Sequence, residues 1–71
     1  MNLPEKLARE IARVTSLREV YAETERLLGG NNCRPAMAMM DFALERAKIA
    51  AGSPDIEQQI VALRDLEGFT S

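Results

Sequence analysis

Few side chains in this sequence could do acid–base or nucleophilic chemistry. There is no histidine, and Cys33 is the only cysteine among 71 residues. A cysteine nucleophile needs a neighbouring base, usually an imidazole, to act as a thiolate at neutral pH. Any catalysis would therefore rest on carboxylates alone.

Two pairs of carboxylates are spaced one helical turn apart, Glu19 with Glu23 and Asp41 with Glu45. This spacing could hold a divalent cation or share a proton. Neither pair has a suitable third ligand nearby in the sequence, and such pairs usually lie on a solvated helix face. The chain also lacks the cysteines and histidines of a structural zinc site, and a single cysteine cannot form an intramolecular disulfide. We expect neither an enzyme nor a bound metal or other cofactor.

The segment GGNNCRP, residues 29–35, is the best candidate for a ligand site. A glycine-containing turn that enters a helix presents backbone N–H groups and the positive helix end to an anion. Pro35 removes one of these donors, and the simpler interpretation is an interhelical turn with asparagine caps. Assembly of several copies could add basic residues of the first helix to the site. This alternative ligand site consists of Asn31, Asn32, Arg34, Arg9 and Arg13.

The overall charge argues against several classes of partner. Nine basic and eleven acidic residues make the chain slightly acidic, whereas a protein that binds duplex nucleic acid normally presents a basic face. The first ten residues, MNLPEKLARE, carry charges where a secretory signal needs an apolar run, and no segment approaches the roughly 20 apolar residues of a membrane span. With a lone cysteine, we expect a cytoplasmic protein that binds neither membranes nor duplex nucleic acid.

The composition, rich in alanine, leucine, glutamate and arginine, predicts an all-α fold. Asn2 can cap a first helix over residues 4–28, which Gly29 ends. Ser16 followed by Glu19 is a second capping pattern that could divide this helix. We favour one helix because an apolar stripe continues in phase across Ser16. The stripe consists of Leu7, Ile11, Val14, Leu17, Tyr21, Thr24 and Leu28.

Two further helices complete a single domain of residues 1–71. The second is predicted over residues 34–51 and the third over residues 54–67, with Ser53 as the cap and Pro54 in the first position. The fold is therefore an antiparallel helical hairpin with a shorter third helix. Because so short a chain has a small core, we expect oligomerisation to complete it.

The second helix has a wide apolar face and a separate, smaller apolar patch. At about 100° per residue, the wide face covers roughly 160°. It consists of Met39, Ala50, Ala43, Ala36, Ala47, Met40, Ala51, Leu44 and Met37. A charged strip of Lys48, Asp41 and Glu45 separates this face from the patch of Ala38, Phe42 and Ile49.

The smaller patch can be interpreted in two ways. The third helix or Phe69 could cover it within the same chain, or it could bind another chain. On the second interpretation, the candidate interface is Ala38, Phe42 and Ile49 together with Met39.

These patterns predict a small helical homo-oligomer, a dimer or higher, that binds and regulates or inhibits another protein. In size, helical content and lack of catalytic residues, the chain resembles small interaction proteins of phages and mobile elements. The alternative function is an oligomer that sequesters a small anionic ligand, such as a nucleotide signal.

Overall fold

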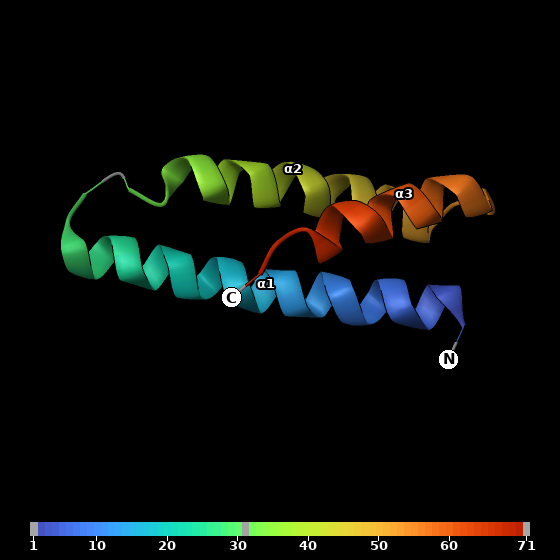
Figure 1. Ribbon diagram of the computed structural model, residues 1–71, viewed down its shortest axis with the longest axis horizontal. Helices are drawn as coiled ribbons and strands as arrows, with labels where there is room; N and C mark the ends of the chain where they lie inside the picture. Colours follow the sequence, from blue (N-terminus) through green and yellow to red (C-terminus); the bar gives the residue numbers. More distant parts are fainter. Residues whose placement is uncertain (1, 31, 71) are drawn as a thin grey trace.

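Three helices make up the fold, as the sequence predicts. The computed structural model describes residues 2–30 and 32–70, with α1 at Leu3–Leu28, α2 at Arg34–Ala51 and α3 at Ile56–Glu67. Helices α1 and α2 form an antiparallel hairpin, and α3 turns back along one half of it (Figure 1). The molecule is elongated, with extents of 42 × 19 × 17 Å. The prediction of a helical hairpin with a shorter third helix is confirmed.

Helix α1 is continuous, so the possible break at Ser16 does not occur. At its start, the Asn2 side chain accepts a hydrogen bond of 2.9 Å from the Glu5 N–H. At its end, Gly29 adopts a left-handed conformation with φ of 67°, and its N–H donates to the Glu25 carbonyl. Glycine suits this position because other residues rarely adopt a positive φ.

Helix α3 begins two residues later than the sequence predicts. The N-cap is Asp55 rather than Ser53, and its carboxylate accepts hydrogen bonds from the N–H groups of Glu57 and Gln58 at 3.0 and 3.3 Å. The Ser53 hydroxyl instead accepts from the Asp55 N–H, so Pro54 lies in the turn before the helix. A carboxylate at the cap is favoured because it satisfies two free N–H groups at the positive helix end.

Replacing Asp55 with alanine should lower the free energy of unfolding by about 1 kcal/mol, because two N–H groups of the first turn lose their acceptor. Urea unfolding followed by circular dichroism measures the change. The matched variant Ser53→Ala removes one hydrogen bond outside the helix and should have a smaller effect. Equal effects of the two substitutions would contradict Asp55 as the cap.

The three helices enclose one apolar core. Its largest fully buried side chains are Leu7 and Val14 of α1, Met40 of α2 and Leu66 of α3. The remaining buried apolar residues are Leu17, Ala43, Leu44, Ala47, Ala50 and Ala62. Three of these residues, Ala43, Ala47 and Ala50, are alanines of α2, and such small side chains allow neighbouring helices to approach closely.

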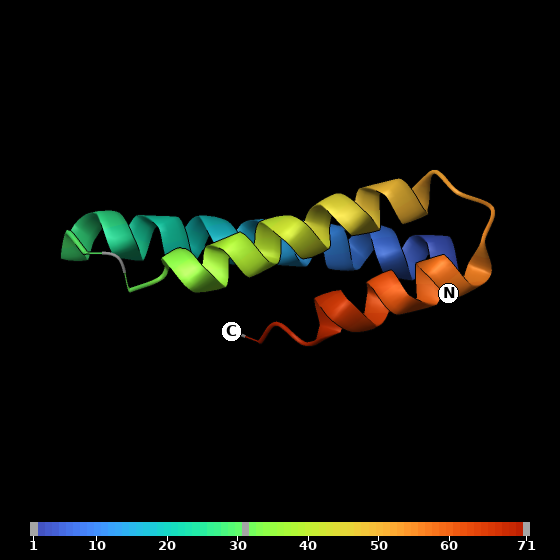
Figure 2. The same ribbon diagram turned by 90° about the horizontal axis from the view of Figure 1, so that it is seen from above.

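Both predicted apolar faces are buried only in part. In the stripe of α1, Thr24 and Leu28 are exposed. In the wide face of α2, Met39 and Ala51 are exposed, so their assignment to the core is wrong. Figures 1 and 2 show why one end of the hairpin is exposed. Helix α3 runs back only to about the middle of the α1–α2 hairpin and does not reach that end.

Polar contacts hold α3 in place at both of its ends. Near the start, the buried Gln59 side chain donates a hydrogen bond of 2.7 Å from Nε2 to the Ser53 carbonyl. At the other end, Arg13 of α1 donates from Nη2 to the Leu66 carbonyl at 3.0 Å. The same guanidinium binds Glu10, and this hydrogen bond raises the pKa of Arg13 above its ordinary value. The charged Arg13 side chain therefore links Glu10 of its own helix to a carbonyl at the end of α3.

Candidate protein-interaction surface

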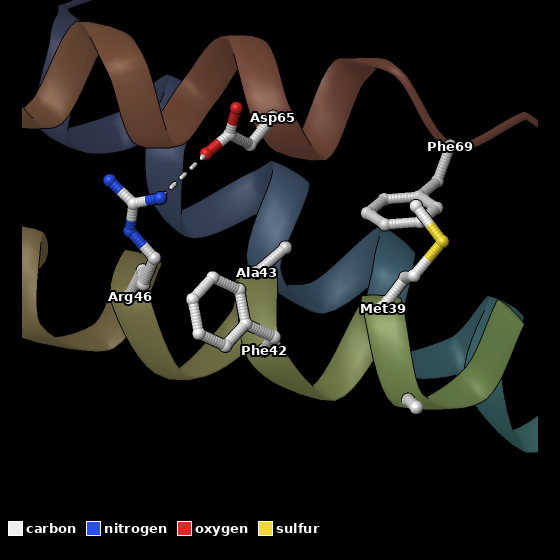
Figure 3. Close-up of a pocket in the computed structure, with 7 residues that line it drawn as sticks. Met39, Phe42, Ala43, Arg46, Asp65 and Phe69 are labelled. Atoms are coloured by element: carbon white, nitrogen blue, oxygen red, sulfur yellow. Dashed lines mark ion pairs between the residues drawn. The ribbon is translucent and has the colours of Figure 1, made fainter. Parts of the chain in front are cut away.

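An open apolar groove of about 480 Å³ lies between α2 and the C-terminal part of the chain (Figure 3). We call it the Phe42 groove. It is lined by Ala38, Met39, Phe42, Ala43 and Arg46 of α2, and by Asp65 and Phe69. Two elements far apart in sequence therefore form its two sides.

Helix α2 supplies the large apolar side chains of this groove. Phe42 is 66% exposed and Met39 is 64% exposed. Both lie one turn or less from buried residues of the same helix, Met40 and Ala43, so the rigid core fixes their backbone positions. Aromatic and methionine side chains held this way are typical anchors of protein interfaces.

The C-terminal residues supply the opposite side of the groove. After α3, the Phe69 N–H donates to the Leu66 carbonyl at 3.1 Å, which turns the chain back toward the core. The Phe69 ring is half-buried and packs against the core cluster. Phe69 therefore forms a wall of the Phe42 groove and leaves the Phe42 ring largely uncovered.

Arg46 is the main polar residue of the groove. Its guanidinium carbon lies 5.7 Å from the centre of the Phe42 ring, and its Nη1 lies 3.9 Å from Oδ2 of Asp65. The two contacts hold the charged group at one end of the groove, next to the aromatic ring (Figure 3). Exposed contacts of this kind contribute little to stability, and they leave the guanidinium accessible to a partner's carboxylate.

The structure unites three of the four predicted interface residues. Ala38, Met39 and Phe42 line the Phe42 groove, whereas Ile49 lines a smaller depression of about 160 Å³ with Arg46, Gln58 and Ala62. Arg46 borders both, so the predicted patch is divided by a charged side chain. This follows from helix geometry, because residue 46 is one turn from Phe42 and nearly one turn from Ile49.

Four residues that line the groove were not among the predicted interface residues, namely Ala43, Arg46, Asp65 and Phe69. The spacing of Phe42 and Arg46, four residues apart on one helix, is a signal that predicts their contact. No comparable signal identifies Asp65, and the sequence indicated Phe69 only as a residue that could cover the patch, because the positions of both depend on where α3 docks.

The residues of the alternative ligand site lie in separate regions. Asn31 is outside the described residues, Asn32 is exposed in the turn, and Arg34 begins α2. Arg13 instead lies against the end of α3 through its bond to the Leu66 carbonyl. Arg9 lines a shallow groove between α1 and α3 together with Lys6, Glu10, Leu63 and Glu67. One chain therefore does not bring the predicted basic residues together.

The start of α2 already has a carboxylate beside it. The Cys33 N–H donates to Oε1 of Glu25 at 3.3 Å. Cys33 is the N-cap residue, and its own side chain makes no capping bond. A negative charge in this position satisfies the positive helix end and repels a second anion.

One member of each acidic pair in the sequence has a simple structural role. Asp41 binds Arg18 through two hydrogen bonds that link α2 to α1, and this contact raises the pKa of Arg18 above its ordinary value. Glu23 pairs with Arg26 on α1. Within residues 2–30 and 32–70, no three acidic or cysteine side chains converge as metal ligands. In the same part of the chain, no helix combines the length and apolar character needed to cross a membrane.

Comparison of the chain with known protein families, curated proteins and solved structures finds no significant match.

Proposed function

We propose that this protein is a small helical, self-associating interaction protein that binds and regulates or inhibits another protein through the Phe42 groove. The observation that carries the proposal is the exposure of Phe42 and Met39 in a groove with an apolar lining. Exposed apolar side chains that cluster on a rigid helix are costly in water, and a partner's apolar side chains remove that cost.

The groove is open and mostly apolar, which suits a helix or an extended segment that inserts an apolar side chain beside Phe42. Arg46 at one end can receive a carboxylate of the same partner. Apolar anchors with one charged contact at the rim are the common composition of such interfaces. The partner class is therefore a protein segment with an apolar anchor and an acidic neighbour.

Affinity capture from cells that produce the protein tests this proposal. The wild-type chain should retain a specific protein from the cells. That protein should bind the wild-type chain again when both are purified. Titration of the Phe42→Asp variant with the same protein should show weaker binding. If no purified protein binds the wild-type chain, or if Phe42→Asp binds it equally well, the proposal is wrong.

The alternative function, sequestering of a small anionic ligand, remains a prediction. The carboxylate of Glu25 at the start of α2 favours the protein-binding proposal over it. Calorimetry with a panel of nucleotides separates the two functions, since only the alternative predicts heat of binding.

A further inference from the structure

We infer that a second copy of this chain docks on the half of the hairpin that α3 leaves open, so that two hairpins pack face to face. This inference rests on the self-association included in the proposed function and assigns it a surface. We call this surface the open face. It consists of Val20, Leu27 and Leu28 of α1 with Met39 and Phe42 of α2.

The length of α3 creates the open face. Helix α1 has 26 residues and α3 has 12, which correspond to about 39 and 18 Å at 1.5 Å per residue. The end of α3 lies opposite the middle of the hairpin, where the Leu66 carbonyl accepts a hydrogen bond from Arg13 and Asp65 lies near Arg46. Beyond these contacts, α1 and α2 are accompanied only by the short segment that follows α3 and carries Phe69 (Figures 1 and 2).

The side of α1 that faces α3 changes character where α3 ends. Positions seven residues apart lie within about 20° of one another on a helix. The row through Arg13 contains Lys6, Arg13, Val20 and Leu27. Lys6 and Arg13 lie beside α3, whereas Val20 and Leu27, which lie beyond it, are 59% and 77% exposed. A row that becomes apolar only where its neighbour is missing indicates that another chain covers it.

Helix α2 shows the same change. Arg46 pairs with Asp65 beside the end of α3, and the residue seven positions before it is Met39. Met39 borders the Phe42 groove next to Phe42, and both are exposed. Met39 of α2, like Val20 and Leu27 of α1, is therefore an exposed apolar residue in a row that carries charge beside α3.

The exposed area is sufficient for a dimer but small for a larger assembly. Full burial of one large apolar side chain removes on the order of 100 Å² of apolar surface from water. The five side chains of the open face, at 59–77% exposure, then offer roughly 300 Å² per copy. Apolar atoms form about 65% of homodimer interfaces, so two copies would bury roughly 1,000 Å² in total. This area reaches the lower limit for a specific interface of about 1,000 Å².

The chemistry of the open face favours an identical partner over a charged one. Its five members are all uncharged, so two copies can meet across a two-fold axis without bringing like charges together. Packing one hairpin on another gives a local four-helix bundle, in which amphipathic helices bury their apolar faces against one another. Because Met39 and Phe42 belong to both surfaces, a second copy seated here competes with a target for the Phe42 groove.

Sedimentation equilibrium of the purified chain at micromolar concentrations tests this inference. The wild-type chain should have the mass of two copies. The double variant Val20→Lys and Leu27→Lys extends the basic row of α1 and should weaken the dimer by at least about 30-fold, because two of the five apolar side chains of the open face are lost. The matched control, Ala8→Lys with Ala12→Lys, adds the same charges at exposed positions outside the open face and should remain a dimer.

Circular dichroism and urea unfolding at concentrations where all variants are single chains establish that the lysines leave the fold intact. A wild-type mass of one chain, or of more than two, would overturn the inference, as would a double variant that dimerises as tightly as the wild type. Target binding is measured separately with Phe42→Asp. If target binding is lost in that variant but the wild type has the mass of one chain, target binding through the Phe42 groove stands, whereas self-association and this inference both fail.

Discussion

Replacing Leu66 with alanine is expected to lower the free energy of unfolding by about 2–5 kcal/mol. Leu66 is fully buried and is the only member of α3 among the largest fully buried side chains of the described residues. A helix of 12 residues is not stable in water on its own, so α3 depends on this packing. A protein of this size has a total stability of roughly 4–10 kcal/mol, so the variant should be unfolded in part at moderate temperature.

Urea unfolding at 25 °C measures this effect, with Ile60→Ala as the matched control. Ile60 is on the same helix but 41% exposed, so its loss should cost clearly less than that of Leu66. Hydrogen exchange adds a local measure, because Leu66→Ala should weaken protection most strongly in α3. Equal costs for the two substitutions would mean that α3 does not dock through Leu66.

Replacing Phe42 with aspartate is expected to weaken binding of a protein target by about 30-fold or more, which corresponds to at least about 2 kcal/mol. The ring is the largest exposed apolar group of the Phe42 groove, and a carboxylate there would have to be desolvated on binding. Because the ring is mostly exposed already, the free energy of unfolding should change by less than about 1 kcal/mol. Titration calorimetry measures the first quantity and urea unfolding the second.

Two controls make the Phe42 result specific. Ala12→Asp adds the same charge at an exposed position of α1 outside the groove and should bind the target normally. Phe42→Leu keeps an apolar side chain and should bind with intermediate affinity. If Phe42→Asp binds like the wild type, or if Ala12→Asp is equally impaired, the Phe42 groove is not the binding surface.

The sequence predicted the helices well because the signals that define them are local. Asn2 at the start of α1 and Gly29 at its end interact with backbone groups within four residues, and such contacts can be read from the order of residues. The start of α3 shows the limit of this reasoning. Ser53 and Asp55 are both good caps, and Asp55 takes the role by accepting hydrogen bonds from two N–H groups.

The composition of the candidate site was predicted less well because it depends on the length and docking of α3. Helical periodicity placed Met39 on the core face, but it could not show that α3 ends before covering that residue. The sequence placed Phe42 on a separate apolar patch, and in the structure the side chain of Phe42 is exposed. Whether Phe69 or α3 would cover it was open in the sequence, because that choice depends on contacts between residues more than 20 positions apart.

The most direct test of the account is site-specific photo-crosslinking from position 42. A benzoylphenylalanine at Phe42 fits the open groove, and irradiation in producing cells should link the chain to a second polypeptide, either a target or another copy. The same group at Ala12, an exposed position outside the groove, should give no specific product. If position 42 forms no crosslink, or forms only the products seen from position 12, then Phe42 faces water and the groove is not a protein-binding surface.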